Sequence, residues 1–331
     1  MPVNVGLDIS AYSVDVVIRQ GDKASQPKQY KQSVEGHAAL ISQLKKAKPT
    51  LIVMEATGIY YFDLAVALAD AGLPVAVINP KSFRHFAELK LQTSKSDGID
   101  ADLLAEYGQR MAPALWTPPD QQHQALRSLG RQINRLVGSR AQAKNRLHAL
   151  KATRSTPALL IEDEQEGIAT LESRIERLRQ AALDLMAEAP VLQRQYEHLL
   201  AAKGVGEATA LSVLAELCVL PRDLKSSQVS RHAGLDVRQH QSGTSVNRPG
   251  RISKAGNVYL RSALYMPALS AVRYDPNAKA FYEALVARGK KKIQALVAVM
   301  RKYLTGLWAC LKTDTPFDSS RLFQPQGLQN A

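Results

Sequence analysis

The first hundred residues alternate between short apolar runs and segments whose apolar positions recur with helical spacing. This pattern predicts strands and helices in turn. The predicted strands cover residues 3–9, 14–19, 50–55 and 74–79, and the predicted helices cover residues 36–46 and 61–71. The order indicates an α/β domain over residues 1–112, in which helices cover a sheet.

Prolines at 113, 118 and 119 then interrupt regular structure, so residues 113–120 are expected to be a linker. Beyond it, apolar residues recur every three or four positions, which predicts coiled-coil helices over residues 121–195. Two arrangements fit the heptads equally: an antiparallel hairpin packing on itself, and association with a second chain. Arg140 occupies one core position and favours a specified pairing.

Residues 196–312 return to helical spacing and are expected to form a mainly helical C-terminal domain. Apolar helices flank a turn that contains Gly204 and Gly206, a pattern typical of a helix-hairpin-helix, in which backbone N–H groups at a helix N-terminus bind phosphate. An ordinary helix–helix turn is the alternative. The polar segment 233–261 is expected to be a loop held on packed helices, and residues 313–331 a disordered tail.

Charge is distributed unevenly along the chain. The formal net charge is +13, and the segment 222–302 alone contains 16 basic and 4 acidic residues, a net of +12. A local excess of this size favours a polyanionic partner, because each phosphate that is neutralised releases counterions. The C-terminal domain is therefore expected to bind nucleic acid.

Other classes of protein fit less well. The chain shows neither an apolar run of about 18 residues nor a signal peptide, so no membrane association is expected. Two cysteines, Cys218 and Cys310, are too few and too far apart for a disulfide framework or a zinc cluster. We expect a cytoplasmic, DNA-associated protein.

Four acidic residues suggest chemistry. Asp8 and Glu55 each end an apolar predicted strand, while Asp97 and Asp100 lie one helical turn apart. Acids at the ends of adjacent strands can meet a helix that carries two more, and carboxylate oxygens suit Mg²⁺ or Mn²⁺. The layout is that of ribonuclease H-like nucleases, which cut phosphodiesters. Asp102 falls off the shared helical face and is expected to be solvated or paired with a base.

Several segments together resemble one family, the DEDD transposases and site-specific recombinases of bacterial insertion sequences, which include pilin-gene invertases and bridge-RNA-guided recombinases. The resemblance covers a RuvC-type, ribonuclease H-like half, a coiled coil and a C-terminal transposase domain. The segments that carry it are Gly6-Leu7-Asp8, Val53-Met54-Glu55-Ala56-Thr57-Gly58, Lys95-Ser96-Asp97-Gly98-Ile99-Asp100-Ala101, Gln241-Ser242-Gly243 and Ile252-Ser253-Lys254-Ala255-Gly256-Asn257.

The resemblance implies that the four acids bind divalent metal and that Ser242 becomes covalently joined to DNA. When the residues alone are considered, Ser245 and Ser253 are also candidates for the nucleophile. Alternatively, the Ser242 hydroxyl only caps a turn. The resemblance also implies DNA partners, donor and target, and a guide (bridge) RNA. Besides the glycines of the 204–206 turn, the residues expected to contact nucleic acid are Arg248, Arg251, Lys254, Asn257 and Arg261.

Three other functions remain open at this point. A metal-dependent junction resolvase or nuclease would use water as nucleophile. An actin-like or sugar-kinase ATPase also begins with a strand ending in Gly-x-Asp, but the first 110 residues show no second glycine-rich phosphate loop. A nucleic-acid-binding regulator would not cut at all. Because the acids and Ser242 lie some 140 residues apart, a composite site in a homodimer or tetramer is a further hypothesis.

Overall fold

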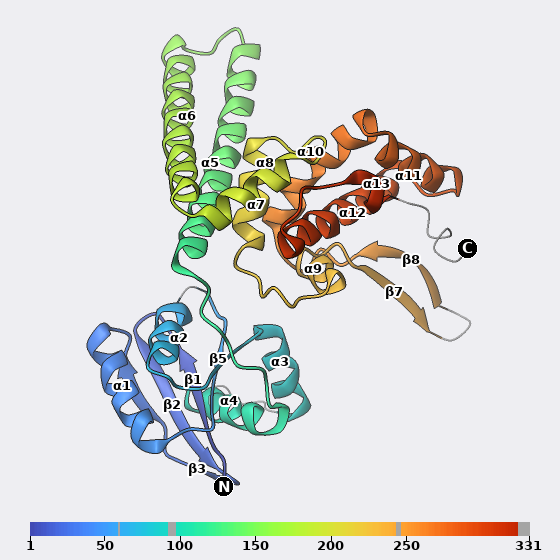
Figure 1. The fold of residues 1–331 in the computed structure, drawn as a ribbon. Helices are drawn as coiled ribbons and strands as arrows, with labels where there is room; N and C mark the ends of the chain where they lie inside the picture. Colours follow the sequence, from blue (N-terminus) through green and yellow to red (C-terminus); the bar gives the residue numbers. More distant parts are fainter. Residues whose placement is uncertain (59, 92–96, 243–245, 324–331) are drawn as a thin grey trace, which may run out of the picture. The chain divides into compact units, whose positions relative to one another are not determined.

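The computed structural model of the chain describes residues 1–331 except 59, 92–96, 243–245 and 324–331. It divides the chain into two compact units, residues 1–118 and 119–331 (Figure 1). Each unit is described by itself.

The N-terminal unit is a six-stranded sheet with helices on both faces. Its strands are β1 (Val3–Ile9), β2 (Ser13–Gln20), β3 (Lys23–Ala24), β4 (Lys28–Lys31), β5 (Leu51–Glu55) and β6 (Val75–Ile78). Its helices are α1 (Val34–Ala47), α2 (Tyr61–Asp70), α3 (Pro80–Leu89) and α4 (Asp97–Met111). The predicted strands and helices of this half are confirmed, while β3, β4 and α3 are additions that the apolar pattern did not indicate.

The strand order is β3-β2-β1-β5-β6, with β4 also paired to β2. β1 and β2 form an antiparallel hairpin, whereas β1, β5 and β6 run parallel. Helices α1 and α2 bury Leu40, Leu44 and Leu64 against one face of the sheet. Helices α3 and α4 cover the other, where Phe86 and Tyr107 pack edge to face. The carboxyl ends of β1 and β5 therefore open at one edge of a sheet that is shielded on both sides.

The C-terminal unit is helical apart from one hairpin. Its helices are α5 (Gln121–Ala152), α6 (Ala158–Ala187), α7 (Pro190–Leu200), α8 (Glu207–Leu217), α9 (Ser226–His232), α10 (Val258–Tyr274), α11 (Pro276–Ala287), α12 (Lys292–Thr313) and α13 (Ser319–Leu322), and its strands are β7 (Val237–Ser242) and β8 (Val246–Ile252). Helix α12 runs through the core and buries Tyr303 and Trp308 completely. Both side chains also donate hydrogen bonds to backbone carbonyls, Tyr303 to Lys203 at 2.9 Å and Trp308 to Leu224 at 3.1 Å.

Helices α5 and α6 pack against each other as an antiparallel hairpin within the chain (Figure 1). Ion pairs cross between them: Arg146 contacts Glu164 at 2.6 Å, and Lys144 contacts Glu172 at 2.8 Å. Arg140, expected in a core position, lies at the margin instead, 3.8 Å from Glu172. The hairpin is thus one of the two predicted arrangements.

Two expectations for the C-terminal unit need correction. The polar segment expected to be a loop contains the antiparallel hairpin β7–β8. The tail expected to be disordered from residue 313 is ordered through residue 323, because Phe317 and Phe323 are buried against Tyr303, with ring centroids 5.1 and 6.0 Å apart. Burial of two aromatic rings compensates for the entropy lost on ordering this segment. Residues 324–331 lie outside the described residues.

Candidate active site

Asp8 and Glu55 lie at the same edge of the sheet. Strands β1 and β5 are parallel neighbours, and their register pairs Leu7 with Met54, so the next residue on each strand is the acid. Both carboxyl groups therefore stand at the carboxyl ends of adjacent parallel strands, where open α/β sheets usually bind ligands.

Helix α4 brings the second pair of acids to this edge. It packs so closely on β1 that a Cβ on Gly6 would lie 1.9 Å from the carbonyl oxygen of Ala101 and 2.5 Å from the backbone nitrogen of Ala105. Residues two apart on a strand share a face, so Asp8 points to the same side as Gly6. The first turn of α4, which carries Asp97 and Asp100, lies on that side. A glycine two residues before the acid is what allows this approach.

The pKa of Asp8 records how these charges interact. Burial raises it first, and the negative charges of Asp100, Asp97, Asp15 and Glu55 raise it further, to about 6 from an ordinary value of 3.8. The other three acids predicted from the sequence therefore all act electrostatically on Asp8. Within the described residues, however, no three Asp, Glu, His or Cys side chains are grouped closely enough to hold a metal ion as they stand.

Two further residues at this edge were missed by sequence reasoning. Thr57 donates a hydrogen bond of 2.7 Å from its hydroxyl to Glu55, which fixes that carboxylate. Asp15 is aligned with Asp8 across the β1–β2 hairpin and is only 8% exposed. Both of its carboxylate oxygens accept hydrogen bonds from Gln29, each at 3.2 Å. The spacing Glu-x-Thr could have indicated the first residue, but only the strand register identifies the second.

Asp102 is paired with a base, which is one of the two alternatives predicted for it. Its carboxylate lies 3.4 Å from the guanidinium of Arg19 on β2, which also contacts Glu106 at 3.2 Å. Lys90 and Arg110 contact Glu106 as well, at 3.0 and 2.6 Å. These contacts between the acids of α4 and bases hold the helix on the sheet.

Ser242 is the last residue of β7, where it pairs with Val246 of β8. The neighbouring candidate Ser245 lies outside the described residues. Arg248 lies on β8 opposite His240. The site therefore belongs to a β-hairpin that projects from the helical unit (Figure 1).

The segment that follows β8 is hydrogen-bonded to the residue before β7 and so closes the base of this hairpin. The Ser253 hydroxyl donates a hydrogen bond to Asp236, and the two residues also bond through their backbones at 2.9 Å. A Cβ on Gly256 would lie 2.2 Å from the carbonyl oxygen of His232, so this position requires glycine. Ser253, one substitute for the nucleophile, is thus engaged in holding the hairpin.

An ionic network surrounds the buried carboxylate of Glu216, next to this segment. Glu216 on α8 is 1% exposed and accepts hydrogen bonds from Arg131 at 2.6 and 2.9 Å and from Asn257 at 2.6 Å, with Arg127 at 3.5 Å. Burial raises the pKa of Glu216, but the hydrogen bonds of Arg131 and Asn257 and the charges of Arg131 and Arg127 outweigh it, and the pKa is lowered. The network ties α5, α8 and the turn after β8 together.

The residues predicted to contact nucleic acid divide into two groups. Arg251 and Lys254 are exposed. Asn257 and Arg261 contact the protein itself: the Asn257 side chain caps α10, and Arg261 donates to the carbonyl oxygen of Ala233 at 2.8 Å. For all of them, binding to nucleic acid stays a prediction.

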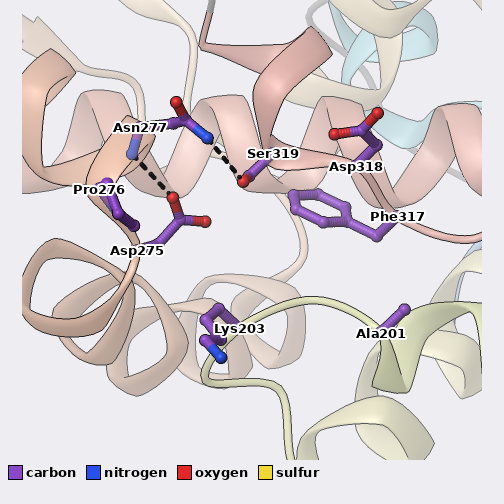
Figure 2. Close-up of a pocket in the computed structure, with 8 residues that line it drawn as sticks. All are labelled: Ala201, Lys203, Asp275, Pro276, Asn277, Phe317, Asp318 and Ser319. Carbon is purple, nitrogen blue, oxygen red and sulfur yellow. Dashed lines mark hydrogen bonds between the residues drawn. The ribbon is translucent and has the colours of Figure 1, made fainter.

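The glycine turn between α7 and α8 packs against α10. Gly204 has φ +84°, and a Cβ there would lie 2.7 Å from the Ser270 side chain, whereas Gly206 is the N-cap of α8 and meets nothing. Figure 2 shows Lys203 of this turn in a pocket that Asp275 and Asp318 also line. Two acids make this pocket unsuitable for phosphate. The open N–H groups at the start of α8 are the remaining candidate.

Comparison with known proteins identifies the class. The DEDD transposase model of the IS110 type, described as "Transposase", matches residues 5–152, and "Transposase IS116/IS110/IS902 family" matches residues 196–283. The pilin gene-inverting protein of Moraxella lacunata is 31% identical over 274 residues, covering 81% of both chains. The transposase for insertion sequence element IS1111A of Coxiella burnetii is 27% identical over 303 residues, covering 83% of this chain and 81% of that one.

Among solved structures, RuvC of Thermus thermophilus in complex with a Holliday junction substrate is 17% identical and has a TM-score of 0.28, covering 35% of this chain and 99% of that one. Within the described part of the chain, every helix is too short or too polar to span a lipid bilayer.

The sheet edge that carries Asp8, Glu55, Asp97 and Asp100 is called the acidic edge below. The comparisons identify the chain with this α/β unit and the helical unit that follows it as a transposase or recombinase, an enzyme that acts on DNA. The chain belongs to the IS110 family of DEDD transposases. The predicted α/β half followed by a mainly helical half is confirmed, while the RuvC-type assignment of the first half and the helix-hairpin-helix in the second stay predictions.

Proposed function

We propose that this transposase cuts and rejoins DNA through a serine that becomes covalently joined to the strand, with divalent metal held by Asp8, Glu55, Asp97 and Asp100. The observation that carries the proposal is the convergence of these acids at one sheet edge, where burial and then the charges of the neighbouring acids raise the pKa of Asp8 to about 6. A cluster that destabilises itself in this way calls for a compensating cation.

The donor set fits Mg²⁺ or Mn²⁺. All four side chains offer carboxylate oxygens, the ligands that hard cations prefer. These four carboxylates would hold the ion, which would supply polarisation of the scissile phosphate and stabilisation of charge on the attacking and leaving oxygens. Thr57 orients Glu55, and Asp15 adds negative charge beside Asp8.

The proposed covalent step uses the Ser242 hydroxyl. Its oxygen forms a bond to phosphorus, the bond from phosphorus to a deoxyribose oxygen breaks, and the leaving oxygen takes a proton. A hydroxyl of another DNA strand later attacks the phosphoserine and releases the serine. Ester bonds are conserved throughout, so strand exchange needs no high-energy cofactor. Arg251 and Lys254, which are exposed, would offset charge on the phosphoryl oxygens.

Recognition of the DNA ends belongs to the same proposal. The C-terminal unit has the net positive charge to hold DNA, and the α8 N-terminus with Gly204 and Gly206 would contact a phosphate without reading sequence. A guide RNA encoded beside the gene, a homo-oligomer and a cytoplasmic location complete it. In the oligomer, acids from one protomer would act with Ser242 of another.

The decisive experiment is capture of a covalent adduct. The full chain, its flanking non-coding RNA and a plasmid with the element's ends are mixed in Mg²⁺ and denatured, and DNA retained on protein is measured. We expect an adduct with the natural chain and with Ser253→Ala, and none with Ser242→Ala. Cleavage by Ser242→Ala without an adduct would establish the alternative, a nuclease that uses water.

Two additional arms test the remaining parts. Omitting the RNA should abolish the adduct if a guide is required, and a chelator should abolish it if metal is required. Mixing an Asp8→Ala chain with a Ser242→Ala chain should restore activity if the site is composite. A mixture that stays as inactive as each parent would show that acids and serine come from one chain.

A further inference from the structure

Two tyrosines are held in solvent beside the acidic edge. Tyr12 lies in the turn that joins β1 to β2, four residues after Asp8, and is 88% exposed. Tyr60 follows β5, five residues after Glu55, and is 46% exposed. Both loops leave the carboxyl ends of the parallel strands that carry the acids. An aromatic ring thus follows each of the two strand-end acids.

The turn that carries Tyr12 is held rigidly. The hydroxyl of Ser10 accepts hydrogen bonds from the backbone nitrogens of Tyr12 at 3.4 Å and Ser13 at 3.1 Å. The same hydroxyl lies 2.9 Å from that of Ser13, and the backbone nitrogen of Ser10 donates to the carbonyl oxygen of Ser13 at 2.9 Å. The exposed ring is therefore mounted on a fixed backbone, which lowers the entropy lost when it binds a partner.

One residue connects the two tyrosine loops. The backbone nitrogen of Gln32 donates to the carbonyl oxygen of Tyr12 at 2.9 Å, and its side-chain amide donates to that of Tyr60 at 2.5 Å. The Gln32 side chain is itself held by His37 at 2.9 Å. These hydrogen bonds fix the two loops relative to each other, although the loops are far apart in sequence.

We propose that Tyr12 and Tyr60 stack on unpaired nucleobases next to the phosphate at the acidic edge, an inference that rests on the proposed function. Carboxylates repel the DNA backbone, so attraction at this edge must come in part from contacts that do not depend on phosphate charge. Stacking meets that need, because every base presents an aromatic face and no particular sequence is required. Gln32 sets the spacing of the two stacking positions.

The test compares two single strands of the same charge. A fluorescent oligo(dT) of about 20 nucleotides and an abasic strand of equal length are bound to the full chain in Mg²⁺. We expect Tyr12→Ala and Tyr60→Ala each to weaken oligo(dT) binding about 10-fold while leaving abasic binding unchanged, and Tyr12→Phe and Tyr60→Phe to bind as the natural chain does. Tyr274→Ala, which removes a tyrosine that is 69% exposed in the C-terminal unit, is the matched control.

Photocrosslinking locates the contact independently of affinity. Replacing the thymines by 5-iodouracil and mapping crosslinked peptides by mass spectrometry should identify Tyr12 or Tyr60. Crosslinks confined to other residues, together with Ala variants that bind oligo(dT) normally, would overturn the inference. The Ser242 adduct is measured separately: an adduct without stacking refutes only this inference, and stacking without an adduct refutes only the proposed function.

Discussion

Each unit of this transposase contains a partly or fully buried carboxylate, and the two are treated in opposite ways. Asp8 is partly buried and faces other acids, so its pKa is raised to about 6. Glu216 faces Arg131, Arg127 and Asn257, and its pKa is lowered. The like charges around Asp8 destabilise the folded state, and a bound cation would offset them. The second surrounds the Glu216 carboxylate with positive charge and joins three elements, so it serves the fold.

The contrast teaches which acids to assign to chemistry. Asp102 and Glu106 lie on the same helix as Asp97 and Asp100, but bases neutralise them. Burial together with the charges of nearby acids, which raise the pKa of Asp8, distinguishes the candidate site. The following predictions test this difference.

The largest effect is expected at the acidic edge. Asp8→Asn should lower recombination roughly 10³-fold, because it removes an anionic oxygen from the proposed metal site. Asp102→Asn, its control at an acid of α4 that is paired with Arg19, should change the rate less than about 3-fold. The assay is plasmid recombination in Mg²⁺. Equal losses in both variants would mean that the distinction between paired and unpaired acids is wrong.

Glu216→Gln should cost roughly 3 kcal/mol of unfolding free energy, because the partly buried guanidinium groups of Arg127 and Arg131 lose their buried counter-charge. In a protein of this size that lowers the melting temperature by several degrees. Glu207→Gln, an exposed acid paired with Arg179 near the start of the same helix, should shift it by less than a degree or two. Thermal denaturation followed by circular dichroism measures both. A melting temperature unchanged in Glu216→Gln would contradict a structural role.

The same carboxylate predicts an acid limit to stability. Since the pKa of Glu216 is lower in the folded than in the unfolded chain, its stabilisation is present above the unfolded value and is lost as pH falls through the folded one. The melting temperature of Glu216→Gln should therefore approach that of the natural chain as pH falls below about 4. The melting temperatures of the natural chain and of Glu216→Gln are measured across the same pH range. If the ionised carboxylate of Glu216 does not contribute to stability, the difference between the two melting temperatures will not change with pH.

Thr57→Val should raise the Mg²⁺ concentration for half-maximal recombination about 10-fold, because Glu55 loses the hydrogen bond that orients it. Thr57→Ser keeps the hydroxyl and should therefore need the same Mg²⁺ concentration as the natural chain. A metal titration of each variant makes the comparison. Loss of maximal rate without any change in Mg²⁺ requirement would place Thr57 outside the metal site.

The smallest effect is a gain in stability. Asp8→Asn should stabilise the metal-free protein by about 1 kcal/mol above pH 6, after allowance for solvent screening. The sign follows from the raised pKa: the folded state loses stability from this group as pH rises from 3.8 to about 6. Below pH 4 the gain should vanish. Mg²⁺ at pH 8 should stabilise the natural chain more than the variant, as thermal denaturation can show.

The sequence allowed much of the fold and the acidic set to be predicted, but not the supporting contacts. Apolar runs identified β1, β5 and β6, and strand-end position identified Asp8 and Glu55. The hairpin β7–β8 was missed because its residues are polar and Val237 is 53% exposed, so no alternation of buried positions distinguishes it from a loop. Glu216 was missed because its partners, Arg131 and Asn257, are far away in sequence.

By itself, the sequence determined the order of elements and the division of charge and allowed the four acids to be predicted as a candidate site, because these follow from periodicity and residue type along a single strand or helix. Only the tertiary structure decided which charges are compensated. Arg19 neutralises Asp102 through a contact between β2 and α4, while Asp97 and Asp100 meet Asp8. Electrostatic interactions depend on distance in space, and neighbouring acids on one helix therefore acquire opposite roles.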